Sequence, residues 1–415
     1  MKNRVLYFSD ILKKYLANDR LWVLGSMLFS KVSFFVVSIF AARMLSKSEL
    51  GMVVSVVNYM AFFTPFLGGG AYQGLLKFGS AMQDEKDLRD LGRYSFSYGF
   101  WANFLVNLLM LIVAILFFYS EISILWLVLL FSLRFLGLYF IEIIKAKERA
   151  SFRNKKFALV EWVHSASFLL MSLIFIYLWG LWGYVFALCV SPFSVLLLRI
   201  DRSYFRLKPS SVMAFDERRF WRFSLSTSLA YLVQEFQFLI DVFLVGIFFS
   251  SDEVAEYKTI SLIPLNLLFL ARVFIATDYP MLCKNNASAS FLRGYVIRYM
   301  LLFVPMSLVL LALGIYFADE IMRIFGKDYE NQTLFSIFMG SAVFGLLFRI
   351  PFSNLLFAIE KTKTHLIISS VSAFILMLMI SISVRYEAIE MVAMCSLLSM
   401  ALSGGLYAIF FYRYR

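Results

Sequence analysis

The chain has 415 residues, of which 61% are hydrophobic and only 16% are charged. A chain with this composition would aggregate in water, so a soluble globular protein is excluded. The formal net charge is +12, but the basic residues lie in short segments between long apolar stretches. That distribution is typical of a membrane protein and not of a nucleic-acid-binding one.

The first 20 residues are charged and amphipathic, and the apolar stretch that follows is too long for a signal-peptide core. We expect residues 1–20 to form an uncleaved helix on the cytoplasmic membrane surface. A hydrocarbon core about 30 Å thick needs roughly 20 helical residues to cross it, and lipid offers no partner for open backbone groups. The predicted membrane helices are therefore residues 21–44, 50–78, 94–119, 121–145, 157–178, 180–200, 220–245, 257–282, 294–317, 331–358, 363–385 and 388–412.

The second predicted helix contains Pro65, Gly68, Gly69, Gly70 and Gly74. Proline interrupts the helical hydrogen-bond ladder and glycine weakens a helix, so this pattern predicts a bend. Close packing against a neighbouring helix through small residues is the alternative interpretation.

The basic residues between the helices predict the orientation of the chain. If the N-terminus is cytoplasmic, the inner segments hold 28 Lys and Arg residues, whereas the opposite loops hold four, Lys47, Arg323, Lys327 and Arg385. The positive-inside bias then places both termini in the cytoplasm and requires an even number of crossings. Attraction to anionic membrane lipids is a secondary effect of the same surplus.

The loop after the first predicted helix is echoed by the loop after the seventh. Ser46 aligns with Ser250 and Glu49 with Glu253, an offset of 204 residues that is close to half the chain. The pattern predicts two six-helix halves of the same orientation, residues 1–207 and 208–415. Repeats of this kind place a substrate site between the halves and allow alternating access.

Five basic residues lie inside the predicted helices or near their ends, and we assign them to substrate binding: Lys31, Arg134, Arg272, Arg298 and Arg349. A basic side chain at the centre of a membrane helix costs about 3 kcal/mol when it faces lipid. These residues therefore pair with acids or line a wet cavity that suits an anionic substrate. Snorkelling and purely internal ion pairs are the structural alternatives.

Four titratable residues are candidates for coupling transport to an ion: Glu235, Asp241, Glu161 and His164. Glu235 and Asp241 lie along a polar stripe on the seventh helix, and Glu161 and His164 share a face of the fifth. The offset of 204 residues places Lys31 over Glu235, so these two could pair in one transport state, or the match could be coincidental. Glu161 and His164 form one Glu-x-x-His pair without a second copy, so a proton relay or polar packing is favoured over a metal site.

Cys189, Cys283 and Cys395 have no paired spacing, so they are interpreted as core residues and not as disulfide or zinc ligands. A phosphate-binding loop, a nucleophile elbow and a kinase signature are all absent from the sequence. We therefore predict that the protein is not an enzyme and that it has no cofactor beyond a coupling ion, H⁺ or Na⁺.

The chain resembles the Wzx-type polysaccharide flippases of the multidrug/oligosaccharidyl-lipid/polysaccharide (MOP) exporter superfamily. The resemblance rests on the spans and termini described above, on the Ala42–Leu45 and Glu49–Gly51 segments, and on Asp241 with the Asp252–Tyr257 loop. It implies an all-α integral membrane fold of about 12 transmembrane helices in two pseudo-symmetric six-helix bundles, like that of the MATE transporters. The second loop departs from the family pattern at Ala255 and Glu256, where glycine is more usual.

The resemblance also implies a function. Such proteins move undecaprenyl-pyrophosphate-linked oligosaccharide from the cytoplasmic to the periplasmic leaflet of a bacterial inner membrane, as in O-antigen and lipopolysaccharide biosynthesis, by ion-coupled antiport. The implied partners are the lipid-linked oligosaccharide, membrane lipids, a polysaccharide polymerase and a chain-length regulator, without nucleic acid. The alternatives are a multidrug exporter of the same fold, whose cationic cargo would favour an acidic cavity, and a membrane oligosaccharide polymerase or ligase, which would need a larger outer loop.

Overall fold

A computed structural model describes residues 20–82, 84–198, 216–284, 288–359, 361–386 and 388–414. Within these ranges the chain is helical and contains no strand. The predicted surface helix lies outside the described residues apart from Arg20, with which the first described helix begins. The predicted boundary between the halves at 207/208 also lies outside them.

The described chain forms two compact units. Unit 1 holds the residues up to Leu45 and Tyr59–Tyr231, and unit 2 holds Ser46–Asn58 and Leu232–Arg415. The helices whose residues lie mainly in unit 1 are α2 (Arg20–Met44), η1 (Thr64–Gly70), α4 (Ala71–Gly79), α5 (Glu85–Phe118), α6 (Ile122–Ala150), α7 (Asn154–Val190) and η2 (Ser191–Leu197). Those of unit 2 are α9 (Ser251–Asn266), α10 (Leu268–Lys284), α11 (Ala289–Tyr316), α12 (Ala318–Arg323), α13 (Gln332–Phe344), η4 (Gly345–Arg349), α14 (Ile350–Ala358), α15 (Thr362–Ser383), η5 (Val384–Tyr386) and α16 (Ile389–Tyr414).

Two helices divide between the units. Most of α3 (Lys47–Ala61), which follows the first membrane helix, belongs to unit 2. The first part of α8 (Glu217–Phe248) belongs to unit 1, although the rest of that helix belongs to unit 2. Each unit therefore contains a helical segment that the sequence repeat assigns to the other half.

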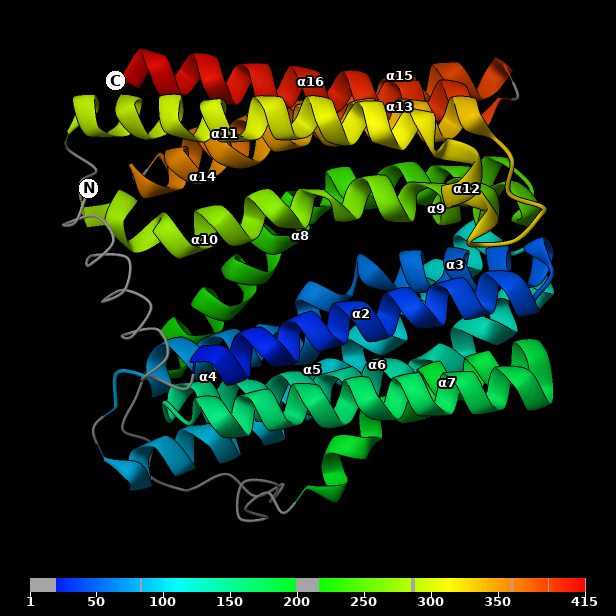
Figure 1. The fold of residues 1–415 in the computed structure, drawn as a ribbon. Helices are drawn as coiled ribbons and strands as arrows, with labels where there is room; N and C mark the ends of the chain where they lie inside the picture. The colour runs from blue at the N-terminus through cyan, green and yellow to red at the C-terminus, as the bar shows by residue number, and fades with distance from the viewer. Residues whose placement is uncertain are drawn as a thin grey trace. The chain divides into compact units, whose positions relative to one another are not determined.

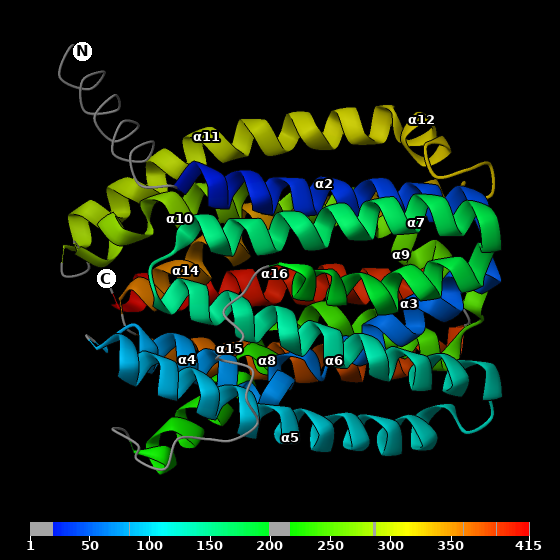
Figure 2. The same ribbon diagram turned by 90° about the horizontal axis from the view of Figure 1, so that it is seen from below.

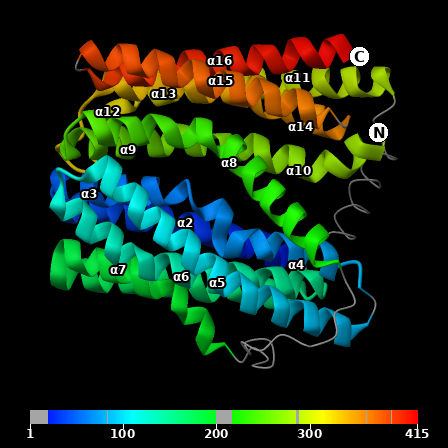
Figure 3. The same cartoon turned by 180° about the vertical axis from the view of Figure 1, so that it is seen from behind.

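In unit 1, α2 lies along α7, and α6 packs against both α5 and α7 (Figures 1 and 2). The interior of the unit is aromatic, with Phe131, Phe135 and Tyr139 of α6 fully buried. In unit 2, α16 lies beside α15 and also contacts α13 and α14 (Figures 1 and 3). The many large apolar side chains left exposed on both units suit an outer surface that faces lipid.

The chain reverses direction inside α7. Gly180 has φ 54° and ψ −127°, a combination that only glycine adopts readily. The rings of Phe175 and Phe186 are 5.0 Å apart, whereas residues at that spacing in one continuous helix would be about 16 Å apart. The two arms of α7 are therefore separate crossings, as predicted for residues 157–178 and 180–200.

The predicted bend in the second membrane helix is present, because α3 and the η1–α4 segment meet at 45°. Gly68, Gly69 and Gly70 all have positive φ there. The alternative interpretation, close packing, is also correct. A Cβ atom on Gly68 would lie 2.5 Å from Cε2 of Tyr139, so the glycine run serves both the backbone turn and the contact with α6.

Matching hydrogen bonds occur at the starts of α3 and α9, the two segments that the sequence repeat aligns. The Ser46 hydroxyl and backbone N–H donate to Glu49 Oε2 at 3.0 and 2.9 Å. The Ser250 hydroxyl and N–H donate to Glu253 Oε2 at 2.7 and 2.9 Å. Both helices thus begin with the same reciprocal serine–glutamate cap.

Among the described residues, nine helices are long and apolar enough to cross a membrane, or up to ten if the bent α3–α4 pair counts as one span. Counting the two arms of α7 separately and adding α8 brings the number of crossings in the described chain to twelve. This agrees with the predicted all-α, twelve-helix membrane fold.

Candidate substrate and ion sites

The five predicted substrate-binding cations occupy two kinds of position. Lys31 on α2, Arg272 on α10 and Arg298 on α11 are exposed on the surfaces of their units. Arg298 Nε donates to a carbonyl one turn earlier in its own helix at 3.1 Å. Arg134 is half-buried and Arg349 is buried, each inside its own unit. The five side chains therefore do not form one cluster within either unit.

Arg134 joins α6 to the second arm of α7. Its Nη1 donates to the Leu188 carbonyl at 2.6 Å, while its buried Nε has no hydrogen-bond partner in the described part of the chain. A charged donor on a backbone carbonyl is a strong interaction away from water. At least one N–H group of Arg134 therefore has a structural role, because it links α6 to the second arm of α7.

Of the two unit 1 candidates for ion coupling, Glu161 belongs to an ion-pair triad and His164 lies beside it. Lys145 Nζ is 3.0 Å from Glu142 Oε1 and 3.1 Å from Glu161 Oε2. Lys145, one of the 28 basic residues assigned to the inner segments, lies on α6 and bridges the two acids, so the triad carries one net negative charge. His164 is close enough for the charges of Glu161, Lys145 and Arg134 to act on it.

The described residues contain no group of three or more His, Cys, Asp or Glu side chains that could hold a metal ion. Cys189 and Cys395 are buried free thiols, as the core interpretation predicts.

In unit 2, Asp241 on α8 is buried and accepts two hydroxyl hydrogen bonds on Oδ2. Tyr257 of α9 and Ser396 of α16 each donate at 3.1 Å. Asp241 also lines a cavity of about 350 Å³, open space at its mouth included, and Arg349 lines the same cavity. The structure thus brings a predicted coupling residue and a predicted substrate residue together.

The remaining predicted coupling residue is Glu235. It belongs to α8, but its side chain lies outside the part of the chain that the structure describes. The pairing of Lys31 with Glu235 therefore stays a prediction.

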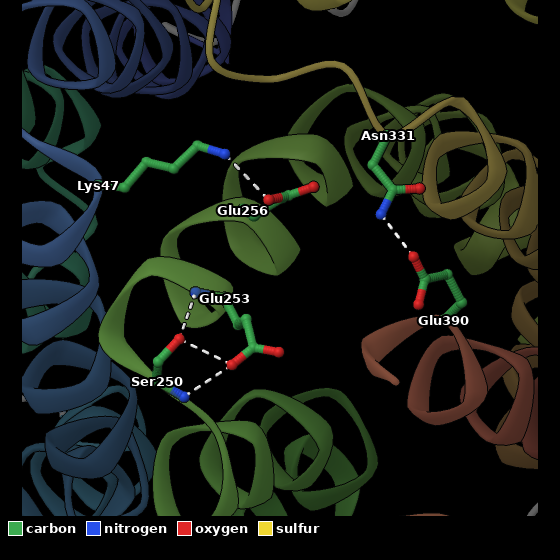
Figure 4. A network of polar contacts seen from close by, with 6 residues as sticks. All are labelled: Lys47, Ser250, Glu253, Glu256, Asn331 and Glu390. Atoms are coloured by element: carbon green, nitrogen blue, oxygen red, sulfur yellow. Dashed lines mark hydrogen bonds and ion pairs between the residues drawn. The ribbon is translucent and has the colours of Figure 1, made fainter. Parts of the chain in front are cut away.

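Polar contacts join neighbouring segments at one end of unit 2, where α3 and α9 begin (Figure 4). We call this end the α3–α9 end. Lys47 Nζ lies 3.0 Å from Glu256 Oε2 and 5.2 Å from the centre of the Tyr329 ring. Burial raises the pKa of Tyr329 to about 12, so its ring stays neutral beside the ammonium. Asn331 Nδ2 donates to Glu390 Oε1 at 2.6 Å, which joins the start of α13 to the start of α16. This end corresponds to the predicted outer side.

Sequence reasoning missed several residues around Asp241. Lys258 acts electrostatically on this carboxylate, and Tyr257 and Ser396 bond to it directly. Tyr257 and Lys258 are adjacent at the start of an otherwise apolar span, a signal that could have indicated them. Ser396 lies in a serine-containing helix with no distinguishing pattern, so only the packing of α16 identifies it.

Residues 40–333 match the family described as "Polysaccharide biosynthesis protein". A search of curated protein sequences found no match. An inward-facing multidrug resistance MATE family transporter of the MOP superfamily has a similar structure, with a TM-score of 0.70 at 14% identity over 93% of this chain and 94% of that one. The lipid II flippase MurJ in an inward closed conformation gives 0.69 at 15% identity, covering 94% and 87%. The Vibrio cholerae MATE transporter VcmN gives 0.61 at 14% identity, covering 98% and 97%.

Proposed function

This chain belongs to the polysaccharide biosynthesis protein family and has the MOP superfamily fold, and from that premise we propose that it flips undecaprenyl-pyrophosphate-linked oligosaccharide across a bacterial inner membrane. The protein is a multi-pass membrane transporter. The proposed direction is from the cytoplasmic to the periplasmic leaflet, with both termini in the cytoplasm. A polysaccharide polymerase and a chain-length regulator would act on the product.

The observation that carries this proposal is the exposure of Lys31 and Arg272 on helices that cross the membrane. A basic side chain that faces lipid near the middle of a bilayer costs about 3 kcal/mol. An exposed position is tolerable if it faces a water-filled path, where a pyrophosphate would supply the opposite charge. The sugar would travel through this path while the lipid tail stays in the bilayer.

Two of the similar structures are MATE transporters, and one of these is a multidrug resistance transporter, so drug export is the competing function. Drugs carried by such exporters are commonly cationic, and the exposed cations Lys31 of unit 1 and Arg272 of unit 2 would each repel them. Efflux of a cationic dye by reconstituted protein, in the absence of glycan-lipid movement, would favour the drug-export function.

We place ion coupling at the buried or partly buried acids of the two units. In unit 2 the residue is Asp241, and in unit 1 it is Glu161 with His164 beside it. Glu235 is a further candidate. Binding and release of H⁺ or Na⁺ at these groups would bias alternating access, because an ion shifts a conformational equilibrium only when it binds the two states with different affinity.

The test is translocation of a fluorescent lipid-linked oligosaccharide in reconstituted vesicles, with and without an imposed H⁺ or Na⁺ gradient. Removing one charge-assisted phosphate contact costs about 1.5–3 kcal/mol, which is roughly a 10- to 150-fold loss of affinity. Lys31→Ala and Arg272→Ala should each lower translocation at limiting substrate by about that factor. Arg272→Lys should recover only part, because an ammonium lacks the bidentate fork.

The matched control is Lys327→Ala, which removes the same charge from an exposed loop position at the α3–α9 end. It should translocate as the unmodified protein does. Unchanged translocation by both Lys31→Ala and Arg272→Ala, at equal membrane levels, would rule out the proposed path.

A further inference from the structure

The start of α8 carries three arginines within its first two turns. Arg218, Arg219 and Arg222 are all exposed, and they belong to the part of α8 that lies in unit 1. Arg218 and Arg222 are four residues apart on one helix face, where like charges repel. The first turn of a helix is also the positive end of its dipole, which disfavours cations. An anion bound beside these side chains would offset both effects.

Lys77 of α4 adds a fourth exposed cation at the same place. Its ammonium lies 4.1 Å from the centre of the Phe223 ring, and the Arg219 guanidinium lies 6.0 Å from the centre of the Phe78 ring. The two rings meet edge to face, with their centres 5.8 Å apart. Lys77 and Arg219 are therefore anchored to one aromatic contact, and α4 and α8 present their cations at a single junction.

Packing holds this junction in one geometry. A Cβ atom on Gly74 of α4 would lie 2.4 Å from Ser224 Oγ and 2.5 Å from Phe220 Cε2, so the glycine allows α8 to approach α4 closely. Phe220 is fully buried. The Trp221 Nε1–H donates to the Tyr94 hydroxyl at 2.9 Å, which joins the same turn of α8 to α5. The places from which the four cations extend are therefore fixed by the core of unit 1.

The two acids at the start of α8 leave a positive surplus. Asp216 Oδ1 accepts the Arg219 backbone N–H at 3.1 Å, and Glu217 Oε2 accepts the Tyr94 hydroxyl at 3.0 Å. The ion pairs between described residues include neither Lys77 nor any of the three α8 arginines. Four basic and two acidic side chains leave two net positive charges at this junction.

The exposed face of α8 changes from basic to apolar along the helix. At spacings of four, three and four residues, one face carries Arg218, Arg222, Leu225 and Leu229. The two leucines are 49% and 55% exposed, and Leu229 lies about 10 Å beyond Arg222 along the helix axis. An anion with a long apolar chain fits this face, with its charge at the arginines and its chain along the leucines. A soluble anion or an acidic protein would make no use of the leucines.

We propose a docking site for the pyrophosphate of a lipid-linked oligosaccharide, named here the α4–α8 site and formed by Lys77, Arg218, Arg219 and Arg222. An arginine fork bonds two phosphate oxygens at once, and a pyrophosphate carries more charge than the single phosphate of an ordinary phospholipid. The predicted orientation puts this site at the cytoplasmic membrane surface, where the substrate would first meet the protein. The inference rests on the proposed function for the identity of the substrate, and it adds the residues that first hold it.

The test is equilibrium binding of radiolabelled undecaprenyl pyrophosphate to the purified full chain in detergent, with the folding of each variant checked by thermal unfolding. Arg218→Gln/Arg222→Gln removes two exposed cations and should weaken binding by about tenfold or more. Lys77→Gln should weaken binding by about threefold. The charge-matched control is Lys86→Gln/Lys156→Gln, which removes two exposed cations elsewhere in unit 1. This control should bind as the unmodified protein does.

Competition separates this ligand from other anions. Inorganic pyrophosphate lacks the apolar chain and phosphatidylglycerol lacks the second phosphate, so each should displace the label only at a much higher concentration than unlabelled undecaprenyl pyrophosphate. Equal displacement by phosphatidylglycerol would overturn the proposal and assign the α4–α8 site to ordinary anionic lipid. Equal displacement by inorganic pyrophosphate would also overturn it, because the leucines would then play no part.

Unchanged binding by Arg218→Gln/Arg222→Gln would likewise reject the site. If that double variant does not fold, Lys77→Gln decides. Binding that depends on these cations, without translocation in vesicles, would reject the proposed function and leave the docking site standing. Translocation by a protein whose binding is indifferent to the four cations would do the reverse.

Discussion

At the residue scale, two glycines of this chain show how the same residue type can be required or dispensable. Gly51 lies in the first turns of α3, where a Cβ would be 1.6 Å from the Ser251 carbonyl oxygen. Gly294 lies in α11, where an added Cβ atom would meet nothing within 4 Å beyond the backbone of its own helix turn. Position in the packing, and not the glycine itself, decides which of the two can change.

We therefore expect Gly51→Ala to destabilise the protein by about 1–3 kcal/mol, because backbone atoms must move apart. Gly294→Ala should instead stabilise it by about 0.5–1 kcal/mol, through the better helix propensity of alanine. Thermal unfolding in detergent measures both. A Gly51→Ala protein as stable as the unmodified chain would contradict the close approach of α3 and α9.

Arg134 and Arg272 also differ in how far the stability of the fold depends on the side chain. Arg134 donates to the Leu188 carbonyl, so Arg134→Ala should lower the free energy of unfolding by about 1–3 kcal/mol. Arg272 is exposed, so Arg272→Ala should lower transport while it changes the free energy of unfolding less than Arg134→Ala does. The paired measurement of unfolding and translocation separates a structural cation from a substrate-binding one. Equal effects of the two variants on unfolding would remove this distinction.

At the element scale, α3 and α9 are held together by their first turns. Their matching serine–glutamate caps bring Lys47 within 3.0 Å of Glu256, and both side chains are only about one-fifth exposed. An ion pair this close to water contributes up to about 1 kcal/mol. The contact between the two helices therefore depends on backbone packing first and on charge second.

The charge contribution can be isolated by a double-mutant cycle. Lys47→Glu should destabilise by about 1 kcal/mol, because it places two acids together, and Glu256→Lys should do the same with two bases. The double variant Lys47→Glu/Glu256→Lys should recover most of the loss. Chemical denaturation of the four proteins gives the coupling free energy, and additive effects of the two single changes would show that the pair does not interact.

At the scale of the whole molecule, the described helices and the distribution of basic residues predict which side of the membrane each loop faces. Lys327 lies in an exposed loop at the α3–α9 end, and Lys156 is exposed at the start of α7. In intact cells with a permeabilised outer membrane, Lys327→Cys should react with an impermeant maleimide. Lys156→Cys should react only after the inner membrane is opened.

Because Cys189 and Cys395 are buried, they should contribute little background labelling, and the unmodified protein serves as the blank. The reverse labelling pattern would invert the orientation and place both termini outside. Labelling of both positions in intact cells would contradict the number of crossings between them.

The sequence by itself determined the features that the bilayer or local hydrogen bonding dictates. Lipid requires long apolar helices, so hydropathy predicted twelve crossings, including the two arms of α7 that meet at Gly180. The Ser46–Glu49 and Ser250–Glu253 caps involve residues three apart, so their repeat could be read directly. The bend at Gly68 followed equally from local backbone chemistry.

Only the tertiary structure decided which side chains meet. In a membrane protein the lipid-facing and core-facing sides of a helix are both apolar, so periodicity says little about which face is buried. Sequence could therefore name Asp241 and Arg349 but could not place them in one cavity. It also could not reveal that Lys145 bridges two acids, or that Lys258 accompanies Asp241. These pairings depend on how α6 meets α7 and how α8 meets α9, and helix packing alone sets that geometry.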